Sequence, residues 1–186
     1  MINTTERIIR RTQNRSKHAV ADLLEMLFAM ELAMPSKRLL IISPWISDLP
    51  VLDNRNGAFS QLETRWGATQ IRFTEVLRTL LQRGVKISLA TRTTTRNEDF
   101  ISRLLSTSEM DGTLDNLNVS QDENNFLFEK EHSKGLISDT WALIGSMNFT
   151  YSGVEINGEL VTFKTDPNSI GQLAAAFTDL FEAENE

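Results

Sequence analysis

His132 and Lys134 are the residues of this 186-residue chain whose types and spacing first suggest chemistry. They lie two positions apart in the stretch EHSKGLISD, residues 131–139. Alternate side chains of an extended segment leave the same face, so we expect the imidazole and the ammonium group side by side. An imidazole can attack a phosphorus atom while an ammonium group holds the phosphate oxygens. The pair therefore indicates chemistry on a phosphate group.

Three more polar side chains follow at positions that can return to this pair. We expect a hairpin from strands over 131–137 and 141–145, which brings Ser146 and Asn148 back toward the phosphate as neutral donors. Glu159 lies on the next expected strand, over 158–164. There its carboxylate could accept the Nδ1 proton of His132 and leave Nε2 free to attack. Turn chemistry for Ser146 and Asn148, and a solvent-facing position for Glu159, are the alternatives.

Two further polar residues are expected to lie away from the phosphate. Asp139 falls on the expected turn over 138–140, and its parity relative to His132 directs it to another side. We expect Asp139 to hold the turn through hydrogen bonds and not to carry a proton. His18, the second of two histidines, lies on an expected N-terminal helix with no lysine two residues later, so we expect a surface or interface residue.

A βαβ unit is expected to form part of the framework that positions these residues. Residues 38–42 and 85–90 are short apolar runs rich in β-branched side chains, which is typical of buried strands. A helix expected over 69–83 joins them, and Gly84 stands where a helix ends. The unit predicts a mixed or parallel sheet.

Helices are expected near both ends of the chain. Residues 4–34 are assigned to one helix, because the apolar residues between Val20 and Leu32 recur at spacings of three and four. A closing helix is expected over 169–182. The other expected elements are a loop over 48–66, a polar turn over 91–97, a helix over 98–106, a loop over 111–118 and a strand over 126–128.

The composition bounds the class of protein. With 40% hydrophobic and 24% charged residues, the chain is of ordinary globular type and has the length of one domain. We expect an N-terminal helical segment, 1–36, packed on a domain over 37–182, with an acidic tail, 183–186. The absence of cysteine and the presence of only two histidines exclude Cys-ligated metals, thiol catalysis and a histidine-rich metal cluster within one chain.

Neither a signal peptide nor a membrane span is expected. Residues 1–9 hold acidic and polar side chains, and no apolar run approaches the roughly 20 residues that cross a bilayer. We therefore expect a cytoplasmic protein that does not associate with membranes.

The net charge of −6 is unevenly distributed. Residues 1–105 carry 16 Lys and Arg against 10 Asp and Glu, whereas residues 106–186 carry 3 against 15. An anionic partner would therefore meet the first half, and solvent-facing basic helices are the alternative. For the basic run between Arg7 and Lys17, a solvated helix is preferred over a nucleic-acid arm.

The stretch around His132 resembles the signature of the phospholipase D superfamily, known as the HKD motif. The residues that carry the resemblance are His132, Lys134, Asp139, Gly145, Ser146, Asn148 and Glu159. Residues 39–48 are similar to the family's first strand and residues 81–90 to its helix–glycine–strand segment, so the resemblance covers about 38–182. It implies an α-β-α sandwich with a mixed central β-sheet flanked by helices and one HKD motif per chain.

The resemblance implies a metal-independent phosphodiesterase that uses no cofactor and forms a covalent phosphohistidine. In this family two HKD motifs build one site, where one histidine attacks and the other protonates the leaving oxygen. Because this chain has a single motif, a competent site would need a C2 homodimer that contributes His132, Lys134 and Asn148 twice. In this the chain is similar to small bacterial nucleases of the family, including members found beside deazapurine DNA-modification and phage-defence genes.

A nucleic acid, DNA before RNA, is the expected substrate, because the chain is small, carries one motif and has a basic first half. Arg55, Arg92 and Arg96 are candidates to contact its backbone. Trp45 follows the first expected strand and could stack on a base or wall the pocket. Surface solvation of the arginines and core packing of the tryptophan are the alternatives.

Two other functions stay open. A lipid phosphodiesterase or transphosphatidylase would share the chemistry, but such enzymes normally carry two motifs and a membrane-binding surface. The chain shows no basic amphipathic helix with exposed Trp or Phe. A catalytically silent nucleic-acid-binding dimer would keep the fold, and the intact His132, Lys134 and Asn148 argue against it.

Overall fold

A seven-stranded mixed β-sheet forms the centre of the structure, a computed structural model that describes residues 5–12, 18–122 and 134–182. In spatial order its strands are β1 (Glu6–Arg11), β9 (Glu159–Lys164), β8 (Ala142–Gly145), β7 (Gly135–Ile137), β2 (Arg38–Ile42), β5 (Lys86–Arg92) and β6 (Leu117–Asp122). The strands β2, β5 and β6 run parallel, and every other neighbouring pair is antiparallel. The predicted mixed sheet is confirmed.

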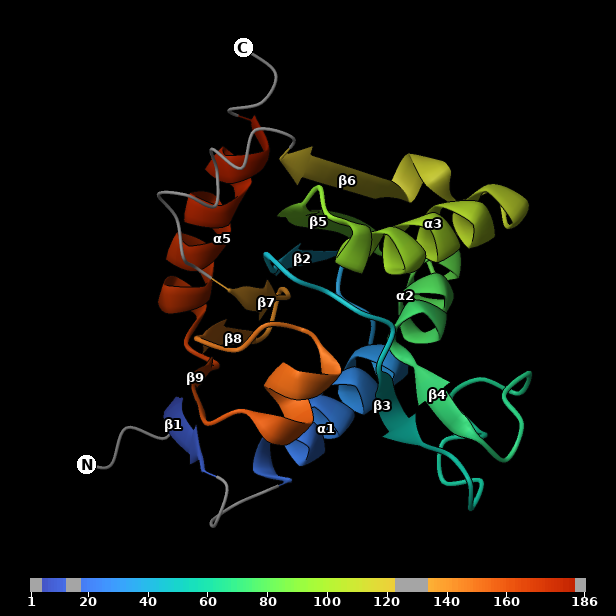
Figure 1. Cartoon of the computed structure of the whole chain (residues 1–186), viewed down its shortest axis with the longest axis horizontal. Coiled ribbons are helices and arrows are strands. Elements are labelled where there is room, and N and C mark those ends of the chain that lie inside the picture. The colour runs from blue at the N-terminus through green and yellow to red at the C-terminus, as the bar shows by residue number, and fades with distance from the viewer. Residues whose placement is uncertain (1–4, 13–17, 123–133, 183–186) are drawn as a thin grey trace.

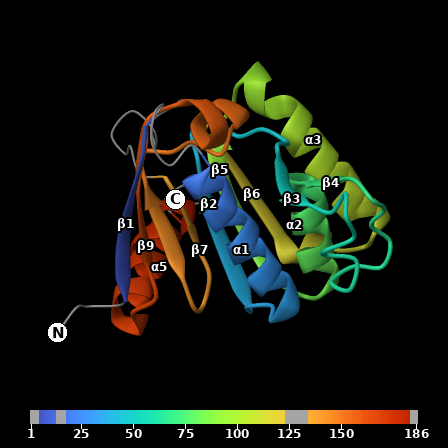
Figure 2. The same cartoon turned by 90° about the horizontal axis from the view of Figure 1, so that it is seen from below.

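Helices cover both faces of this sheet. The helices α1 (Ala19–Ala33), α2 (Phe73–Gln82) and α3 (Thr95–Met110) lie on one face, and α5 (Pro167–Glu182) lies on the other (Figure 1, Figure 2). In β2, Leu39 and Ile41 join the core on the side of the three helices, whereas Leu40 and Ile42 join the core on the side of α5. Burial on both faces explains why this strand is an unbroken apolar run. The predicted α-β-α sandwich is therefore confirmed.

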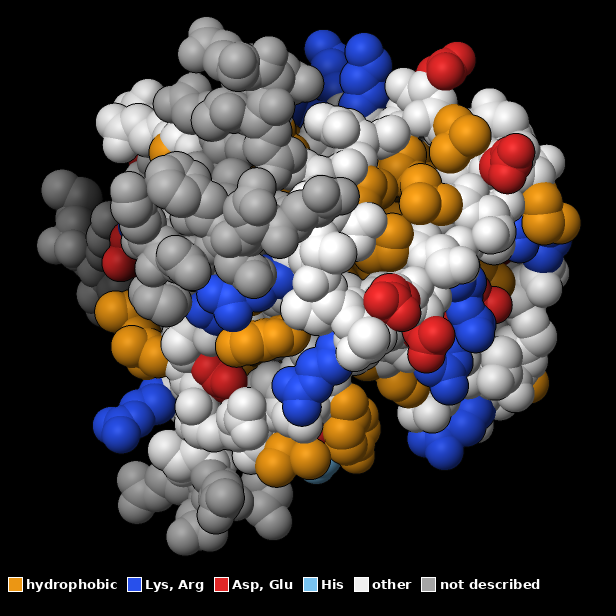
Figure 3. Space-filling view, turned by 45° about the horizontal axis from the view of Figure 1, so that its top comes forward, with side chains coloured by type: hydrophobic (Ala, Val, Ile, Leu, Met, Phe, Trp, Pro, Cys, Tyr) orange, Lys and Arg blue, Asp and Glu red, His pale blue; other side chains and the backbone are white. Residues whose placement is uncertain are grey.

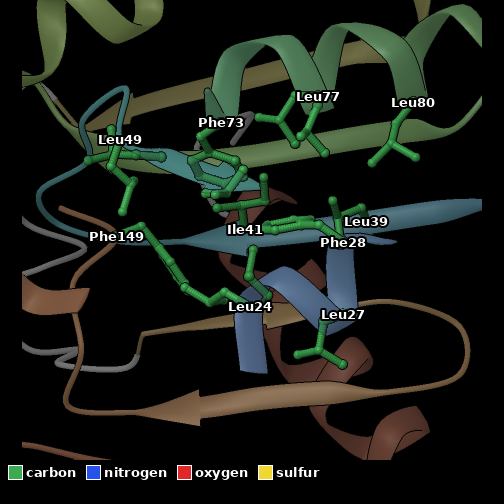
Figure 4. Packing of buried hydrophobic residues seen from close by; sticks show 14 of the residues in the cluster. Leu24, Leu27, Phe28, Leu39, Ile41, Leu49, Phe73, Leu77, Leu80 and Phe149 are labelled. Carbon is green, nitrogen blue, oxygen red and sulfur yellow. The ribbon is translucent and has the colours of Figure 1, made fainter. Parts of the chain in front are cut away.

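The larger core lies between the sheet and the three helices. Phe28 of α1 and Phe73 of α2 meet there with ring centroids 5.2 Å apart, close to Ile41 of β2 (Figure 4). Burying side chains of this size contributes about 1.5–3 kcal/mol each. None of the helices in the described ranges combines the length and the hydropathy that a membrane crossing needs.

The N-terminal segment differs from its prediction. Residues 4–34 were expected to be one helix, but Glu6–Arg11 forms β1, which pairs antiparallel with β9 at the edge of the sheet. The helix prediction is wrong for Glu6–Arg11 because β9 supplies backbone partners that outweigh local preference. Helix α1 begins only at Ala19, where the predicted apolar stripe starts. The prediction that 1–36 is a helical segment is therefore corrected at β1.

Other boundaries also move. The expected loop over 48–66 begins with β3 (Pro50–Asp53), which pairs with β4 (Gln70–Arg72) in a separate two-stranded sheet. This leaves α2 to start at Phe73, where the Glu75 carboxylate accepts a hydrogen bond from the Arg72 backbone N–H at 3.1 Å. Helix α2 ends at Gln82, one residue before the predicted end, and Gly84 follows it with φ +82° as a helix-terminating glycine.

The segment after β5 is more regular than predicted. Helix α3 spans Thr95–Met110 rather than 98–106, and β6 replaces the end of the expected loop over 111–118. A short π-helical segment, Ser152–Ile156, precedes β9. The strand expected over 126–128 and the tail over 183–186 lie outside the described residues.

A buried carboxylate ties α1 to the hairpin of β7 and β8. Glu31 and Trp141 are each 1% exposed, and the indole Nε1 of Trp141 donates to Oε2 of Glu31 at 3.1 Å. The Ser36 backbone N–H donates to Oε1 at 2.6 Å. Burial raises the pKa of Glu31, and these hydrogen bonds oppose the rise because they stabilise the ionised form.

Replacing Trp141 by Phe should lower the free energy of unfolding by about 1–3 kcal/mol, because a buried acceptor loses its donor. The loss should be larger at pH 8 than at pH 5. A raised pKa means that the folded state holds the Glu31 proton more tightly than the unfolded chain, so this group's contribution falls as pH rises, and losing the hydrogen bond raises the pKa further. Urea denaturation at both pH values measures the effect.

The matched control is Trp66→Phe. Trp66 is partly exposed, and within the described ranges its indole has no hydrogen bond. Its substitution should change the unfolding free energy by less than about 0.5 kcal/mol. If Trp141→Phe lowers the free energy of unfolding equally at both pH values, the role assigned to Glu31 is contradicted.

Candidate active site

One edge of the sheet collects the ends of several strands. Gly135, the first residue of β7, is paired with Ile42 at the end of β2 and with Ile144 near the end of β8. Lys134 directly precedes β7, and Ser146 directly follows β8. The sheet therefore brings these two predicted site residues to the same edge. This is the edge at which β2 and β5 have their carboxyl ends, where ligands of open α/β sheets bind.

Glu159 is the first residue of β9 and lies at this edge as a buried carboxylate. It is 8% exposed, and its Oε2 accepts a hydrogen bond from the hydroxyl of Ser146. The Ser146 hydroxyl in turn accepts from the Leu160 backbone N–H at 3.1 Å. A hydroxyl thus fixes the carboxylate and is itself fixed by the backbone. His132, the expected partner of Glu159, lies outside the described residues, so their contact stays a prediction.

Lys134 is the cation of this group. Its side chain is partly buried, and burial lowers its pKa because the charged form loses water. The negative charge of Glu159 opposes this fall in pKa, whereas the positive charge of Arg92 adds to it. The low local dielectric strengthens the attraction of the ammonium for an anion. Across the described residues, no three His, Asp or Glu side chains converge in a way that could hold a metal ion.

Asn148 follows on a tightly folded segment. The Thr150 backbone N–H donates to its carbonyl oxygen at 2.8 Å, and a Cβ atom on Gly153 would lie only 2.2 Å from that oxygen. The segment therefore needs glycine at 153. The side-chain Oδ1 of Asn148 is buried and has no hydrogen bond within the described residues. A buried acceptor of this kind usually has a partner, so this oxygen is available to a donor outside the described residues.

Two buried polar residues that the sequence analysis missed support the site. The Ser43 hydroxyl accepts from the Phe149 backbone N–H at 3.1 Å, which joins the end of β2 to the segment after β8. The side chain of Asn97 is fully buried; it accepts from the Ile46 N–H at 3.0 Å and donates to the Arg92 carbonyl at 2.8 Å. The sequence did offer a signal for each residue. Ser43 is a polar residue directly after the buried strand β2, and Asn97 lies on the first turn of the helix that follows β5.

The four predicted substrate contacts divide into two groups. The guanidinium of Arg92 lies 5.2 Å from the centre of the Trp45 ring, and both residues follow or end strands at the candidate edge. Arg55 instead makes a two-pronged ion pair with Asp53, at 2.9 and 2.6 Å, beside the small sheet of β3 and β4. This pair lowers the pKa of Asp53 to about 2. Arg96 is exposed on the first turn of α3.

Asp139 and His18 lie elsewhere, as their positions in the sequence suggested. Asp139 is at the opposite end of β7 from Lys134, where it accepts from the Lys37 backbone N–H at 2.7 Å and lies 3.3 Å from Nε of Arg38. It anchors the hairpin turn to the start of β2. His18 has a side chain that is 73% exposed at the start of α1, and its Nδ1 lies 3.7 Å from Glu155.

Gly145 sets the spacing of β8 and β9 beside the site. A Cβ atom at this position would lie 2.2 Å from the Leu160 carbonyl oxygen and 2.8 Å from the Cα atom of Val161. Backbone cannot move aside as a flexible side chain can. The glycine therefore allows the close approach at which Ser146 reaches Glu159.

Most of the candidate site lies in a part of the chain that matches a known protein family. A family model described as "Cardiolipin synthase, PLD-like domain" matches residues 63–182, about two thirds of the chain. A search of curated proteins finds no match.

Solved structures show the same fold. NucT from Helicobacter pylori matches with a TM-score of 0.58 at 13% identity over 95% of this chain and 96% of that one. A phospholipase D family member, Nuc from Salmonella typhimurium, matches with a TM-score of 0.59 at 13% identity over 96% and 94%. TrmBL2, an archaeal chromatin protein described with a novel mode of DNA binding, matches with a TM-score of 0.53 at 11% identity over 98% and 54%.

Replacing Gly145 by Ala should destabilise the protein by about 1–3 kcal/mol, because the added methyl group overlaps the Leu160 carbonyl and must push β8 and β9 apart. Thermal or urea unfolding measures the loss. Gly67→Ala is the matched control, since no atom lies within 4 Å of a Cβ there, and it should stay within about 0.5 kcal/mol of the parent. Equal stabilities of the two variants would refute the role of Gly145.

Proposed function

Because the chain belongs to the phospholipase D superfamily, we propose that it is a metal-independent phosphodiesterase whose substrate is nucleic acid, DNA before RNA. The observation that carries the proposal is the group at the sheet edge. Lys134 interacts electrostatically with Glu159, and Glu159 accepts a hydrogen bond from Ser146. A partly buried ammonium beside an oriented carboxylate suits the binding of a phosphate and the alignment of an imidazole.

In the proposed reaction, Nε2 of His132 attacks the phosphorus in line. A nitrogen–phosphorus bond forms while the bond from phosphorus to the leaving oxygen breaks. The protonated His132 of the partner subunit gives its proton to that oxygen. It then takes a proton from a water molecule that attacks the phosphorus, and the nitrogen–phosphorus bond breaks to release the first His132. The site is therefore shared by the two chains of a homodimer. The two histidines need opposite protonation states, so the rate should be highest between mildly acidic and neutral pH.

The described residues have separate roles in this scheme. Lys134 and Asn148 of both chains stabilise the negative oxygens, and Ser146 assists by fixing Glu159. One oxygen of Glu159 is held by Ser146, and the other has no hydrogen bond within the described residues. That second oxygen is available to the Nδ1–H of His132, which would hold the ring in the tautomer that attacks. Asp139 stabilises the hairpin and takes no proton.

Nucleic acid is favoured over lipid by the neighbours of the site. Trp45 and Arg92 together offer an aromatic face and a guanidinium beside Lys134, a combination that can stack on a base and hold a phosphate. The likeness to NucT and Nuc over nearly their whole length supports a small nuclease. A lipid phosphodiesterase is the second candidate, because the matching family model is described by a lipid enzyme.

The full chain should cleave labelled DNA in the presence of EDTA, and His132→Ala should slow cleavage at least about a thousandfold because the nucleophile is removed. A panel of single- and double-stranded DNA and RNA measures the activity and the preferred substrate. His18→Ala is the matched control; this exposed histidine should stay within about twofold of the parent. Activity that EDTA abolishes and Mg²⁺ restores would refute the mechanism. Turnover of phosphatidylglycerol vesicles without DNA cleavage would favour the lipid enzyme.

In the His132→Ala variant, where no catalytic histidine titrates, the alkaline limb of the pH–affinity profile for single-stranded DNA should report Lys134, which must stay protonated to hold the phosphate oxygens. Glu159→Gln should move this limb to lower pH, because the charge that raises the pKa of Lys134 is removed. Arg92→Gln should move it to higher pH, because a charge that lowers the same pKa is removed. Affinities for single-stranded DNA between pH 6 and 11, measured in the His132→Ala background and each normalised to its own maximum, test the two opposite shifts. Shifts in the same direction would show that another group titrates.

A further inference from the structure

We propose that Arg10 of β1 binds a phosphate of the substrate strand several nucleotides from the scissile one, an inference that rests on the proposed nuclease function. The strand β1 runs antiparallel to β9, and its last residue, Arg11, is paired with Glu159. The C-terminal end of β1 therefore reaches the same edge of the sheet as Lys134 and Ser146. This position follows from the strand that the sequence analysis did not predict.

A cavity links β1 to the candidate site. It has a volume of about 620 Å³, and its walls include Arg10 and Thr12 from β1 and the following residue on one side, and Ser146, Glu159 and Leu160 on the other. Ser146 and Glu159 of the candidate site thus line the same cavity as the end of β1. A group bound at Lys134 could extend into this hollow along the edge.

The two neighbouring arginines of β1 have different surroundings. Arg11 is 3% exposed, and its guanidinium donates to the backbone carbonyls of Asn157 and Glu155, so it anchors β1 to the segment before β9. Successive side chains of a strand leave opposite faces, so Arg10 leaves the other face, where it is exposed. Within the described residues Arg10 has neither a hydrogen bond nor an ion pair.

The remaining charge on that face of β1 is already neutralised. Glu6 is the charged residue that shares the face with Arg10, and it forms an ion pair with Lys164 of β9. Among the described residues, Arg10 is therefore the positive charge on that face of β1 that lines the cavity without an acidic partner. Figure 3 shows Lys and Arg side chains scattered over one face, singly and in small groups with acidic side chains among some of them, rather than gathered in one broad basic patch. Such spacing suits separate contacts with successive phosphates.

The distance along the edge sets the class of substrate. The sheet order places β1 three strands from β7, which is about 14 Å at about 4.8 Å per strand. At a rise of about 3.4 Å per nucleotide along the axis of B-form DNA, an edge that runs parallel to this axis would span roughly four phosphates of one strand. A small phosphodiester or a single lipid headgroup bound at Lys134 would not reach Arg10. A polynucleotide strand, in contrast, is long enough to contact both Lys134 and Arg10.

The test compares Arg10→Gln with Arg7→Gln. Arg7 is exposed on the same strand and carries the same charge, but it lies three residues farther from the edge and on the opposite face. Affinity for single-stranded DNA of 3 and 12 nucleotides is measured by fluorescence anisotropy in the His132→Ala background, which does not cleave the probe. Hydrolysis of bis(4-nitrophenyl) phosphate is measured in the His132-containing protein.

Arg10→Gln should weaken binding of the 12-mer about 3- to 10-fold, while 3-mer binding stays within about twofold. For the 12-mer, the slope of the logarithm of affinity against the logarithm of salt concentration should become shallower by about 0.7 for each phosphate that Arg10 no longer neutralises. Arg10→Lys should recover most of the affinity because the charge is kept. Neither Arg10→Gln nor Arg7→Gln should change hydrolysis of the small phosphodiester by more than about twofold.

Equal effects of Arg10→Gln and Arg7→Gln on the 12-mer would overturn the inference and leave the proposed function intact. Arg10-dependent binding to phosphatidylcholine vesicles containing phosphatidylglycerol, without an effect on DNA, would overturn it in favour of a lipid surface. A parent protein that hydrolyses no phosphodiester, but binds the 12-mer through Arg10, would refute the proposed function and support the phosphate contact.

Discussion

The buried carboxylate of Glu159 is the constraint on which the arrangement of the sheet edge depends. A charge that is 8% exposed is tolerated only where donors and cations compensate it. Ser146 supplies a hydroxyl and Lys134 a positive charge, and they come from β8 and β7, the next two strands of the sheet. The dependence is mutual, because Lys134 is itself desolvated and Glu159 favours its charged form. The antiparallel order of β9, β8 and β7 thus places a charged pair where a phosphate can join it.

Precise backbone spacing keeps these groups together. Gly145 lets β8 approach β9 closely enough for the hydroxyl of Ser146 to reach the carboxylate. On the other side of the site, Asn97 bonds to the loops after β2 and β5, and so fixes the backbone that carries Trp45 and Arg92. At the opposite end of the hairpin, Asp139 and the buried pair of Glu31 and Trp141 hold the turn and the strands to the rest of the domain. Hydrogen bonds thus hold the hairpin at its turn and the loops after β2 and β5 at the site.

The sequence predicts the hairpin and the strand that carry the candidate site better than it predicts the outermost strand of the sheet. The relation of Lys134 to Ser146 and Glu159 follows from one hairpin and the next strand, so short-range spacing was sufficient. The apolar run of β2 likewise indicates a buried strand without any partner being known. The strand β1 was not predictable in this way, because its backbone partners in β9 lie near the other end of the chain. The roles of Asn97 and Ser43 were missed for the same reason, since the groups that they bind come together only in the folded protein.

Charge is where local placement matters more than the total. The net charge of −6 suggests a poor partner for a polyanion, and the basic first half suggests a good one. The structure shows that part of this basic charge is neutralised locally. Arg55, Arg65 and Arg78 each form an ion pair with an acidic neighbour, so they add little to the electrostatic potential that a ligand meets. Among the described residues, Lys134, Arg92 and Arg10 instead come from β5 or from strand ends at this side of the sheet, where we propose that they act on a ligand. Since salt screens charges beyond roughly 8–10 Å, a phosphate at the edge responds to the charges close to it more than to the net charge of the chain.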